Sequence, residues 1–122
     1  MISHRCLSLL FLACCFPFVS ASAQEATLTK KHVPKAVLDA FTKAYPKATT
    51  KGFSRETEKG KTSFEVESVE GTVHRDVSYS ADGSLLSIEE SIAYADLPEA
   101  VRAALAKEAP KGTASSCEKI TK

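Results

Sequence analysis

Cysteine is scarce in this chain once its first 23 residues are set aside. Of the four cysteines, Cys6, Cys14 and Cys15 lie in that N-terminal stretch, and Cys117 remains in the rest of the sequence. A single cysteine excludes an intramolecular disulfide and leaves a thiol that is either inert or able to link two chains. We interpret Cys117 as a tail cysteine without a catalytic role, because a cysteine nucleophile needs a neighbouring base to form its thiolate.

The chain also lacks an excess of either charge and a long apolar run. It has 16 Lys and Arg against 15 Asp and Glu, and such a balance argues against nucleic-acid binding, which usually requires a basic excess. The apolar run over residues 6–19 is shorter than the roughly 20 residues needed to cross a membrane. We therefore expect no nucleic-acid partner and no membrane span.

Catalytic signatures are missing as well. Serines and carboxylates are plentiful, but the sequence shows no nucleophile–base spacing, no pair of metal ligands and no glycine-rich phosphate loop. It also shows no aromatic-rich patch, which is the usual anchor of a tight protein interface. The sequence predicts a protein that is not an enzyme and holds no cofactor and no metal.

The first residues have the pattern of a secretory signal. A short basic start over residues 1–5 precedes the apolar run, and the small residues 21–23 form an A-x-A cleavage site. We predict a signal peptide over residues 1–23, cleavage after Ala23, and a periplasmic or secreted protein. A lipoprotein is a less favoured alternative, because the apolar run continues past Cys14 and Cys15.

A helix-sized pattern occurs twice, 64 positions apart. Residues 33–47 and 97–111 share the identical pairs Pro34/Pro98, Ala36/Ala100, Val37/Val101, Ala40/Ala104, Lys43/Lys107, Pro46/Pro110 and Lys47/Lys111. Such a match predicts a duplicated supersecondary unit. Proline suits the first turn of a helix, so we predict helices over about 34–45 and 98–107. The first has the apolar stripe Val37, Leu38, Phe41, Ala44 and Tyr45, and the second the thinner stripe Leu97, Val101, Ala104 and Leu105.

The segment between these helices alternates polar and apolar residues and is divided by glycine turns. It predicts a four-stranded antiparallel meander over 51–57, 62–69, 72–80 and 84–92, with turns at Lys59-Gly60, Glu70-Gly71 and Asp82-Gly83. Residues 24–32 are polar and predict a flexible N-terminal arm, and the tail after residue 111 has room for one short additional strand. The expected fold class is α+β, with an N-terminal and a C-terminal helix covering one face of the sheet.

The register of this meander can be predicted from its turns. If each turn is a two-residue hairpin loop, opposed residues share a face. The resulting pairs are Phe53–Val66, Phe64–Val77, Val77–Ile88, Tyr79–Leu86 and Val73–Ile92, and a one-residue slip would destroy this apolar face. Arg75 and Glu90 oppose each other on the same face, and we predict a structural ion pair because half-buried charges need partners.

The opposite face of the predicted sheet is polar and acidic. Glu65, Asp76 and Glu89 line up across three strands, and His74 lies opposite Glu67, a pairing that would give a mild pH response. One interpretation is a solvated surface that resists aggregation. The other is an acidic platform for a cationic segment or a hard cation such as calcium, although a flat row of strands makes a poor metal cage.

The sequence also resembles a known family. The residues that carry the resemblance, between about 30 and 112, are Val33-Pro34-x-Ala36-Val37, Phe41, Tyr45-Pro46, Phe64-Glu65-Val66-Glu67, residues 77–86 and Leu97-Pro98-x-Ala100-Val101. They look like the PepSY-like domains related to beta-lactamase inhibitory protein. The resemblance implies a secreted, non-enzymatic α+β module of bacterial envelopes over residues 33–122. Unlike the tandem relatives, it would have a second repeat truncated after its helix, so direct beta-lactamase inhibition is not expected.

Two functions remain open from the sequence. The first is a periplasmic or secreted binding module, an inhibitor or sensor of an envelope peptidase. It would bind an envelope protein or a cationic peptide through the polar face formed by Glu65, Glu67, His74, Asp76 and Glu89. The second is a small structural or stress-related envelope protein without a dedicated ligand, dimerising through an edge strand or Cys117.

Overall fold

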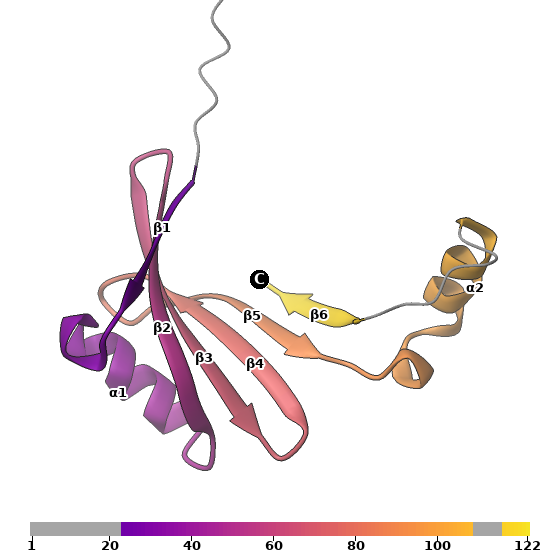
Figure 1. Cartoon of the computed structure of the whole chain (residues 1–122), viewed down its shortest axis with the longest axis horizontal. Coiled ribbons are helices and arrows are strands. Elements are labelled where there is room, and N and C mark those ends of the chain that lie inside the picture. Colours follow the sequence, from indigo (N-terminus) through magenta and orange to yellow (C-terminus); the bar gives the residue numbers. More distant parts are fainter. Residues whose placement is uncertain (1–22, 109–115) are drawn as a thin grey trace, which may run out of the picture.

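The computed structural model describes residues 23–108 and 116–122 and has an α+β fold. In these residues, six antiparallel strands lie in chain order in one sheet, accompanied by two α-helices and two short 3₁₀ helices (Figure 1). The elements are β1 Gln24–Leu28, η1 Lys30–His32, α1 Lys35–Ala44, β2 Thr49–Glu58, β3 Lys61–Glu70, β4 Val73–Tyr79, β5 Leu85–Ser91, η2 Tyr94–Asp96, α2 Glu99–Glu108 and β6 Glu118–Thr121. Most of the expected signal peptide, and the repeat residues Pro110 and Lys111, lie outside the described residues.

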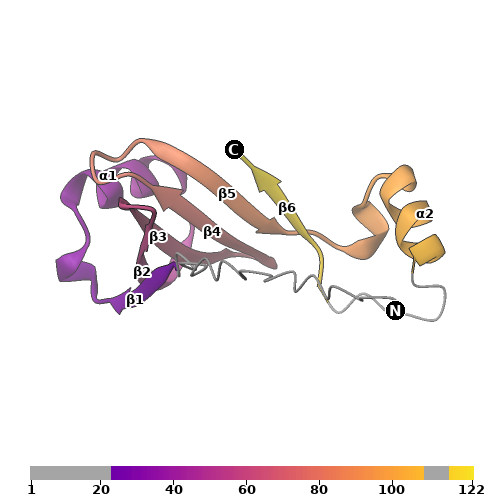
Figure 2. The ribbon, with the colours of Figure 1, turned by 90° about the horizontal axis from the view of Figure 1, so that it is seen from above.

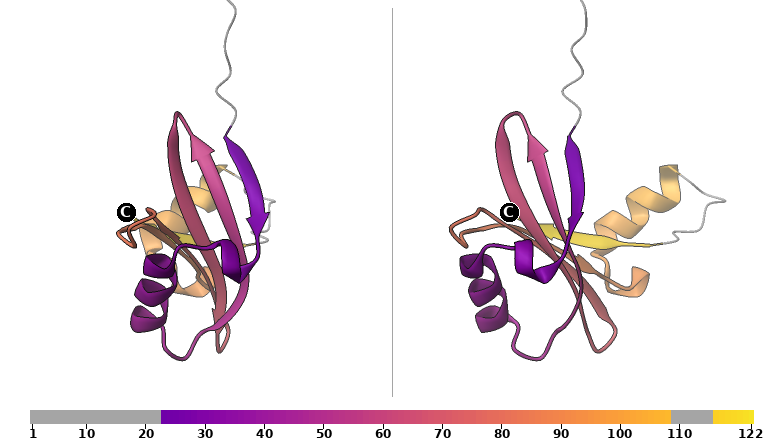
Figure 3. Two further views of the ribbon diagram at one scale, coloured as in Figure 1. Left: turned by 90° about the vertical axis from the view of Figure 1, so that its left-hand side faces the viewer. Right: turned by 60° about the vertical axis from the view of Figure 1, so that its left-hand side comes forward.

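The helix α1 covers one face of the sheet and builds the core with it (Figure 3). Val37 and Phe41 lie four residues apart on one side of the helix, and their side chains are 0% and 4% exposed. They pack in one cluster with Val66 of β3 and with Val77 and Tyr79 of β4. The apolar stripe predicted for the first helix is therefore the stripe that holds it to the sheet.

The four predicted strands correspond to β2–β5, and the sheet has two further strands at its edges. The prediction of a flexible arm over residues 24–32 is wrong, because Gln24–Leu28 forms β1 and pairs with β2. Leu28 lies opposite Phe53 and packs against the core, which explains why this polar segment is ordered. At the other edge, the short additional strand for which the tail has room is present as β6.

The predicted register is correct for three of the pairs and shifted for others. Phe53 faces Val66, Val77 faces Ile88, and Arg75 faces Glu90. Phe64, however, faces Tyr79 instead of Val77.

The cause of this shift is the turn between β3 and β4. The loop consists of Gly71 and Thr72 and not of the predicted Glu70 and Gly71. Gly71 has φ of +63°, a conformation that glycine adopts without strain, and it therefore takes the first position of the loop. The shift is two residues, so every side chain stays on its predicted face.

A bulge in β5 also changes the register. Tyr79 faces Leu85 instead of the predicted Leu86, since the pairing shifts by one residue between Ser78 and Tyr79. Leu86 is 45% exposed and lies outside the core in which it was expected. Ile92, predicted to face Val73, follows the end of β5 and donates its backbone N–H to the Cys117 carbonyl.

The duplicated pattern extends further in the structure than in the sequence. The unit β1-η1-α1-β2 returns as β5-η2-α2-β6, with each 3₁₀ helix and each α-helix displaced by 64 positions. The strand registers repeat as well: Gln24 faces Thr57 in the first unit, and Ile88 faces Thr121 in the second. The duplication therefore includes the pairing of the strands as well as the sequence of the helices.

The second helix differs from the prediction in its position. It was expected to cover the sheet beside α1, but α2 lies beyond the end of β5, away from the face that α1 covers (Figures 1 and 2). Val101 and Leu105 are 43% and 42% exposed, while the equivalent Val37 and Phe41 are buried. The difference has a topological reason. The helix α1 packs on β3 and β4, which are the next two strands after β2. No strand follows β6 in the described sheet, so α2 has no equivalent surface there.

Candidate functional site

The face of the sheet opposite α1 is polar and dominated by carboxylates. Alternation along the paired strands assigns to it Glu25, Thr27, Thr49, Gly52, Ser54, Glu56, Glu58, Lys61, Ser63, Glu65, Glu67, Val69, His74, Asp76, Ser78, Ser87, Glu89, Ser91, Glu118 and Ile120. We call this surface the open face. Lysines gather on the other side of the molecule, in η1 and α1, at Lys30, Lys31, Lys35 and Lys43.

Three carboxylates form a row across the centre of the open face. Glu67 faces Asp76, and Asp76 faces Glu89. The predicted row began with Glu65, but the two-residue shift between β3 and β4 puts Glu67 in that position and Glu65 opposite Ser78. Like charges on directly opposed strand positions destabilise a sheet, so this row carries an energetic cost.

The predicted pair of His74 with Glu67 is wrong for the same reason. His74 faces Val69 across β3, and its backbone N–H donates to Ser91 Oγ at 3.0 Å. His74 is exposed at the margin of the open face. It still lies near enough to Asp76 to lower the pKa of that carboxyl, against the larger opposing effects of burial and neighbouring carboxylates.

The carboxyl of Glu65 is the most perturbed group on the open face. Burial, and after it the nearby charges of Asp76, Glu67, Glu25 and Glu89, together raise its pKa from 4.5 to about 7. Burial and the charges of Glu67, Glu118 and Glu89 likewise raise the pKa of Asp76. These carboxylates therefore repel one another in the folded state, and a cation bound among them would relieve that repulsion.

A glycine makes room for one of these side chains. A Cβ added at Gly52 would lie 3.0 Å from Oε2 of Glu67, so the carboxylate of Glu67 lies directly over the backbone of β2. The β2 strand has a bulge between Thr50 and Gly52 at the same place. Bulges change the direction of side chains. Here the bulge and the glycine lie together on β2, directly beside the carboxylate of Glu67.

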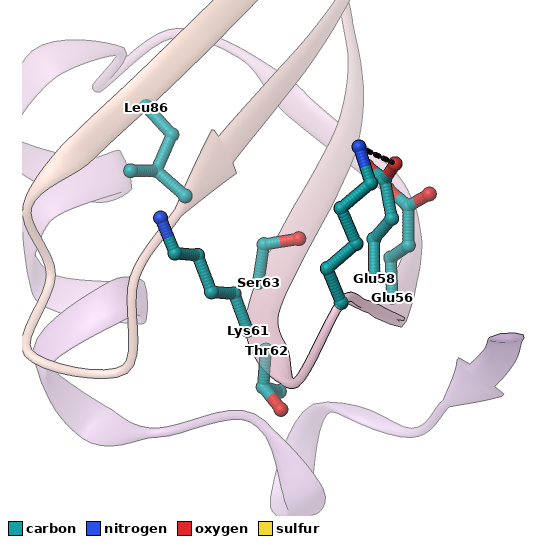
Figure 4. A pocket seen from close by; sticks show the side chains of 7 residues that line it. Glu56, Glu58, Lys61, Thr62, Ser63 and Leu86 are labelled. Carbon is teal, nitrogen blue, oxygen red and sulfur yellow. Dashed lines mark ion pairs between the residues drawn. The ribbon is translucent and has the colours of Figure 1, made fainter. Parts of the chain in front are cut away.

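A shallow hollow of about 310 Å³ lies at one end of the open face, beside the β2–β3 hairpin (Figure 4). It is lined by Glu56, Glu58, Lys59, Lys61, Thr62, Ser63 and Leu86. Lys59 and Glu58 form an ion pair at 3.6 Å, and Leu86 provides the apolar wall. The hollow is not among the sites predicted from the sequence; its signal was the adjacent pair Leu85-Leu86, which breaks the alternation of β5.

Arg75 and Glu90 lie in contact on the face that α1 covers. The Nε atom of Arg75 donates to Glu90 Oε1 at 2.7 Å, and Nη1 donates to Glu70 Oε2 at 3.2 Å. The guanidinium also lies 4.2 Å from the ring centroid of Tyr45. Burial alone would lower the pKa of Arg75, but the hydrogen bonds with Glu90 and Glu70 raise it. This arrangement joins β3, β4, β5 and Tyr45 at the end of α1.

The open face does not have the geometry of a metal site. Within residues 23–108 and 116–122, no three His, Cys, Asp or Glu side chains are grouped to hold a metal ion. The same residues include no helix long and apolar enough to cross a membrane.

Comparison with known proteins adds no assignment. No family model, curated protein or solved structure matches this chain. The resemblance to PepSY-like domains therefore stays an expectation from the sequence.

Proposed function

We propose that this protein is a non-enzymatic, periplasmic or secreted binding module that holds a cationic protein or peptide segment on its open face. The observation that carries this proposal is the row of Glu67, Asp76 and Glu89 with Glu65 beside it, where burial and then mutual repulsion raise the pKa of Glu65 to about 7. Keeping carboxylates together at a cost to stability is typical of functional sites.

An extended cationic segment suits this surface better than a metal ion. The carboxylates follow one another across neighbouring strands on a flat face, whereas calcium needs ligands gathered around one point. Lysine or arginine side chains spaced along a segment can each pair with a different carboxylate. The opposite sign of charge, carried by the lysines of η1 and α1, lies on the other side of the sheet and would orient an approaching partner.

The hollow beside the β2–β3 hairpin supports an apolar contact at one end of the bound segment. Leu86 is 45% exposed and lines the hollow together with Glu56 and Ser63. A partner with one apolar side chain beside its cationic residues would cover Leu86 and remove its surface from water. The proposed partner is therefore a basic segment of an envelope protein, of which a peptidase that the module inhibits or senses is one instance.

The experiment is affinity capture from an envelope extract with the immobilised protein and two matched variants. The first variant, Glu67→Gln/Asp76→Asn/Glu89→Gln, removes the central row of the open face. The second, Asp39→Asn/Asp96→Asn/Glu99→Gln, removes three carboxylates outside the sheet and changes the net charge by the same amount. Circular dichroism and thermal unfolding establish that both variants keep the fold.

We expect one partner to be captured by the native protein and the second variant, and lost with the first. Its release by increasing salt would identify the contact as electrostatic. Equal capture by all three proteins would place the binding site elsewhere and contradict the proposal. Loss in both variants would show that net charge, and not the open face, is responsible, which also contradicts it.

A further inference from the structure

The second unit of the duplication has an apolar stripe that nothing covers in the described part of the chain. Val37 and Phe41 of α1 are 0% and 4% exposed, while the equivalent Val101 and Leu105 of α2 are 43% and 42% exposed. These positions are apolar in both units, but in the second unit a large part of their surface is exposed to water. An apolar stripe on a helix indicates a surface to be buried against another element.

The first unit shows what kind of surface such a helix covers. The helix α1 connects β1 to β2 but packs on residues of β3 and β4, the next two strands beyond β2. Of these, β3 is antiparallel to β2, and β4 is antiparallel to β3 and therefore parallel to β2. By analogy, α2 requires two strands beyond β6, the first antiparallel and the second parallel to it. Among residues 23–108 and 116–122, β6 is the edge of the sheet.

A second copy of the chain supplies strands in that order and with those directions. If two copies meet at β6 around a two-fold axis, the partner's β6 lies antiparallel to β6. The partner's β5, which pairs antiparallel with its own β6, comes next and runs parallel to the first β6. We propose that two copies of this chain form a symmetric dimer through β6, with each α2 lying over the β6 and β5 strands of the partner.

The residues of β6 are complementary to themselves in such a pairing. When Ile120 is placed on the two-fold axis, Glu118 of one copy faces Lys122 of the other, and this contact occurs twice. Ile120, which is 55% exposed, then meets its own counterpart. Opposite charges across paired strands are favourable and like charges are unfavourable, so this register is self-complementary in charge.

A contact between the two different edges of the sheet, β1 and β6, would not close in the same way. A β1–β6 contact would be head-to-tail and would leave free edges that continue into an open chain of molecules. Pairing β6 with itself closes after two copies and covers an exposed edge that would otherwise invite uncontrolled pairing. The inference does not depend on the ligand of the open face.

The test is the dimer dissociation constant measured by sedimentation equilibrium. A reducing agent is present, so that Cys117 cannot link two chains. Glu118→Lys and Lys122→Glu each turn both attractive contacts into repulsive ones, and we expect each to weaken the dimer about fivefold or more. The double variant Glu118→Lys/Lys122→Glu restores the contacts with reversed signs and should regain the original affinity.

A second pair of variants tests the helix. Val101→Ser/Leu105→Ser should weaken the dimer, while the control Ala103→Ser/Ala106→Ser, on the opposite side of α2, should not. A monomer at all concentrations would overturn the proposal. So would a dimer that is insensitive to the charge changes, a dimer whose double variant fails to recover, or a dimer unaffected by the loss of Val101 and Leu105.

Discussion

Glu65 is the residue at which the electrostatic cost of the open face is greatest. Part of its surface is removed from water, and the charges of Asp76, Glu67, Glu25 and Glu89 lie close enough to repel its own. Both effects favour the protonated form, which is why its pKa is raised to about 7. The ionised form of this single side chain therefore opposes folding at neutral and alkaline pH.

Replacing Glu65 with glutamine should stabilise the protein at high pH and leave it unchanged at low pH. The pKa in the folded state lies above the 4.5 of the free side chain, so the stability that protonation contributes is fully present below pH 4.5 and is lost as the pH rises through 7. After allowance for solvent screening of a half-exposed group, we expect a gain of about 1 kcal/mol near pH 8.

Urea unfolding of both proteins from about pH 4 to pH 8 measures this difference. Glu108→Gln, on the exposed helix α2, changes the net charge equally and serves as the control. A Glu65→Gln protein with the same pH profile as the native protein would show that the open face carries no electrostatic strain.

Gly83 is the point at which the β4–β5 turn touches α1. A Cβ at this position would lie 2.6 Å from the carbonyl oxygen of Ala36, and the residue has φ of +85°. We expect Gly83→Ala to destabilise the protein by about 1–3 kcal/mol through backbone strain, and by more through the collision with Ala36. Gly60→Ala is the matched control, because Gly60 has φ of +77° but open space around it.

Thermal or urea unfolding compares these two variants. If Gly60→Ala and Gly83→Ala are equally destabilised, the contact between the turn and α1 contributes nothing beyond the backbone conformation.

Alternation fixes the side of the sheet on which each residue lies, but turn geometry fixes its partner. The faces of Glu65, Asp76 and Glu89 follow from the period of two along a strand. Their alignment depends on whether Gly71 takes the first or the second position of its loop, and both positions accept glycine. The row of carboxylates was therefore predictable as a surface but not in its order.

At the scale of elements, the duplicated unit offers an internal comparison between a packed and an unpacked helix. Val37→Ala should destabilise the protein by about 2 kcal/mol, because it opens a cavity in the core formed by α1, β3 and β4. Val101→Ala, the same change at the equivalent position of α2, should alter stability by less than about 0.5 kcal/mol in the monomer. Unfolding is followed at a protein concentration too low for self-association.

A large effect of Val101→Ala in the monomer would mean that α2 packs against its own sheet. The sequence could not decide this point. Both helices have an apolar stripe, although the second is thinner. The strands that receive α1 follow β2, while β6 ends the described sheet. Likewise, β1 is not evident from its polar sequence, and its order depends on pairing with β2 and on burial of Leu28.

At the scale of the whole molecule, the sheet separates two kinds of surface. One side carries α1, its lysines and the core, and the other carries the carboxylates of the open face. The resulting field would draw a cationic partner toward the open face and hold a like-charged surface away. Because the charges are exposed or half-exposed, this effect should weaken as the salt concentration approaches and exceeds the physiological value.

The most direct measurement is a titration of the Glu65 side-chain carboxyl by carbon-13 NMR, with and without a bound lysine-rich peptide. The proposal predicts a midpoint near pH 7 for the protein alone, and a midpoint lower by at least about one pH unit with the peptide bound, since a nearby cation favours the carboxylate. A midpoint that does not move when the peptide is bound would contradict the proposal that the open face holds a cationic segment.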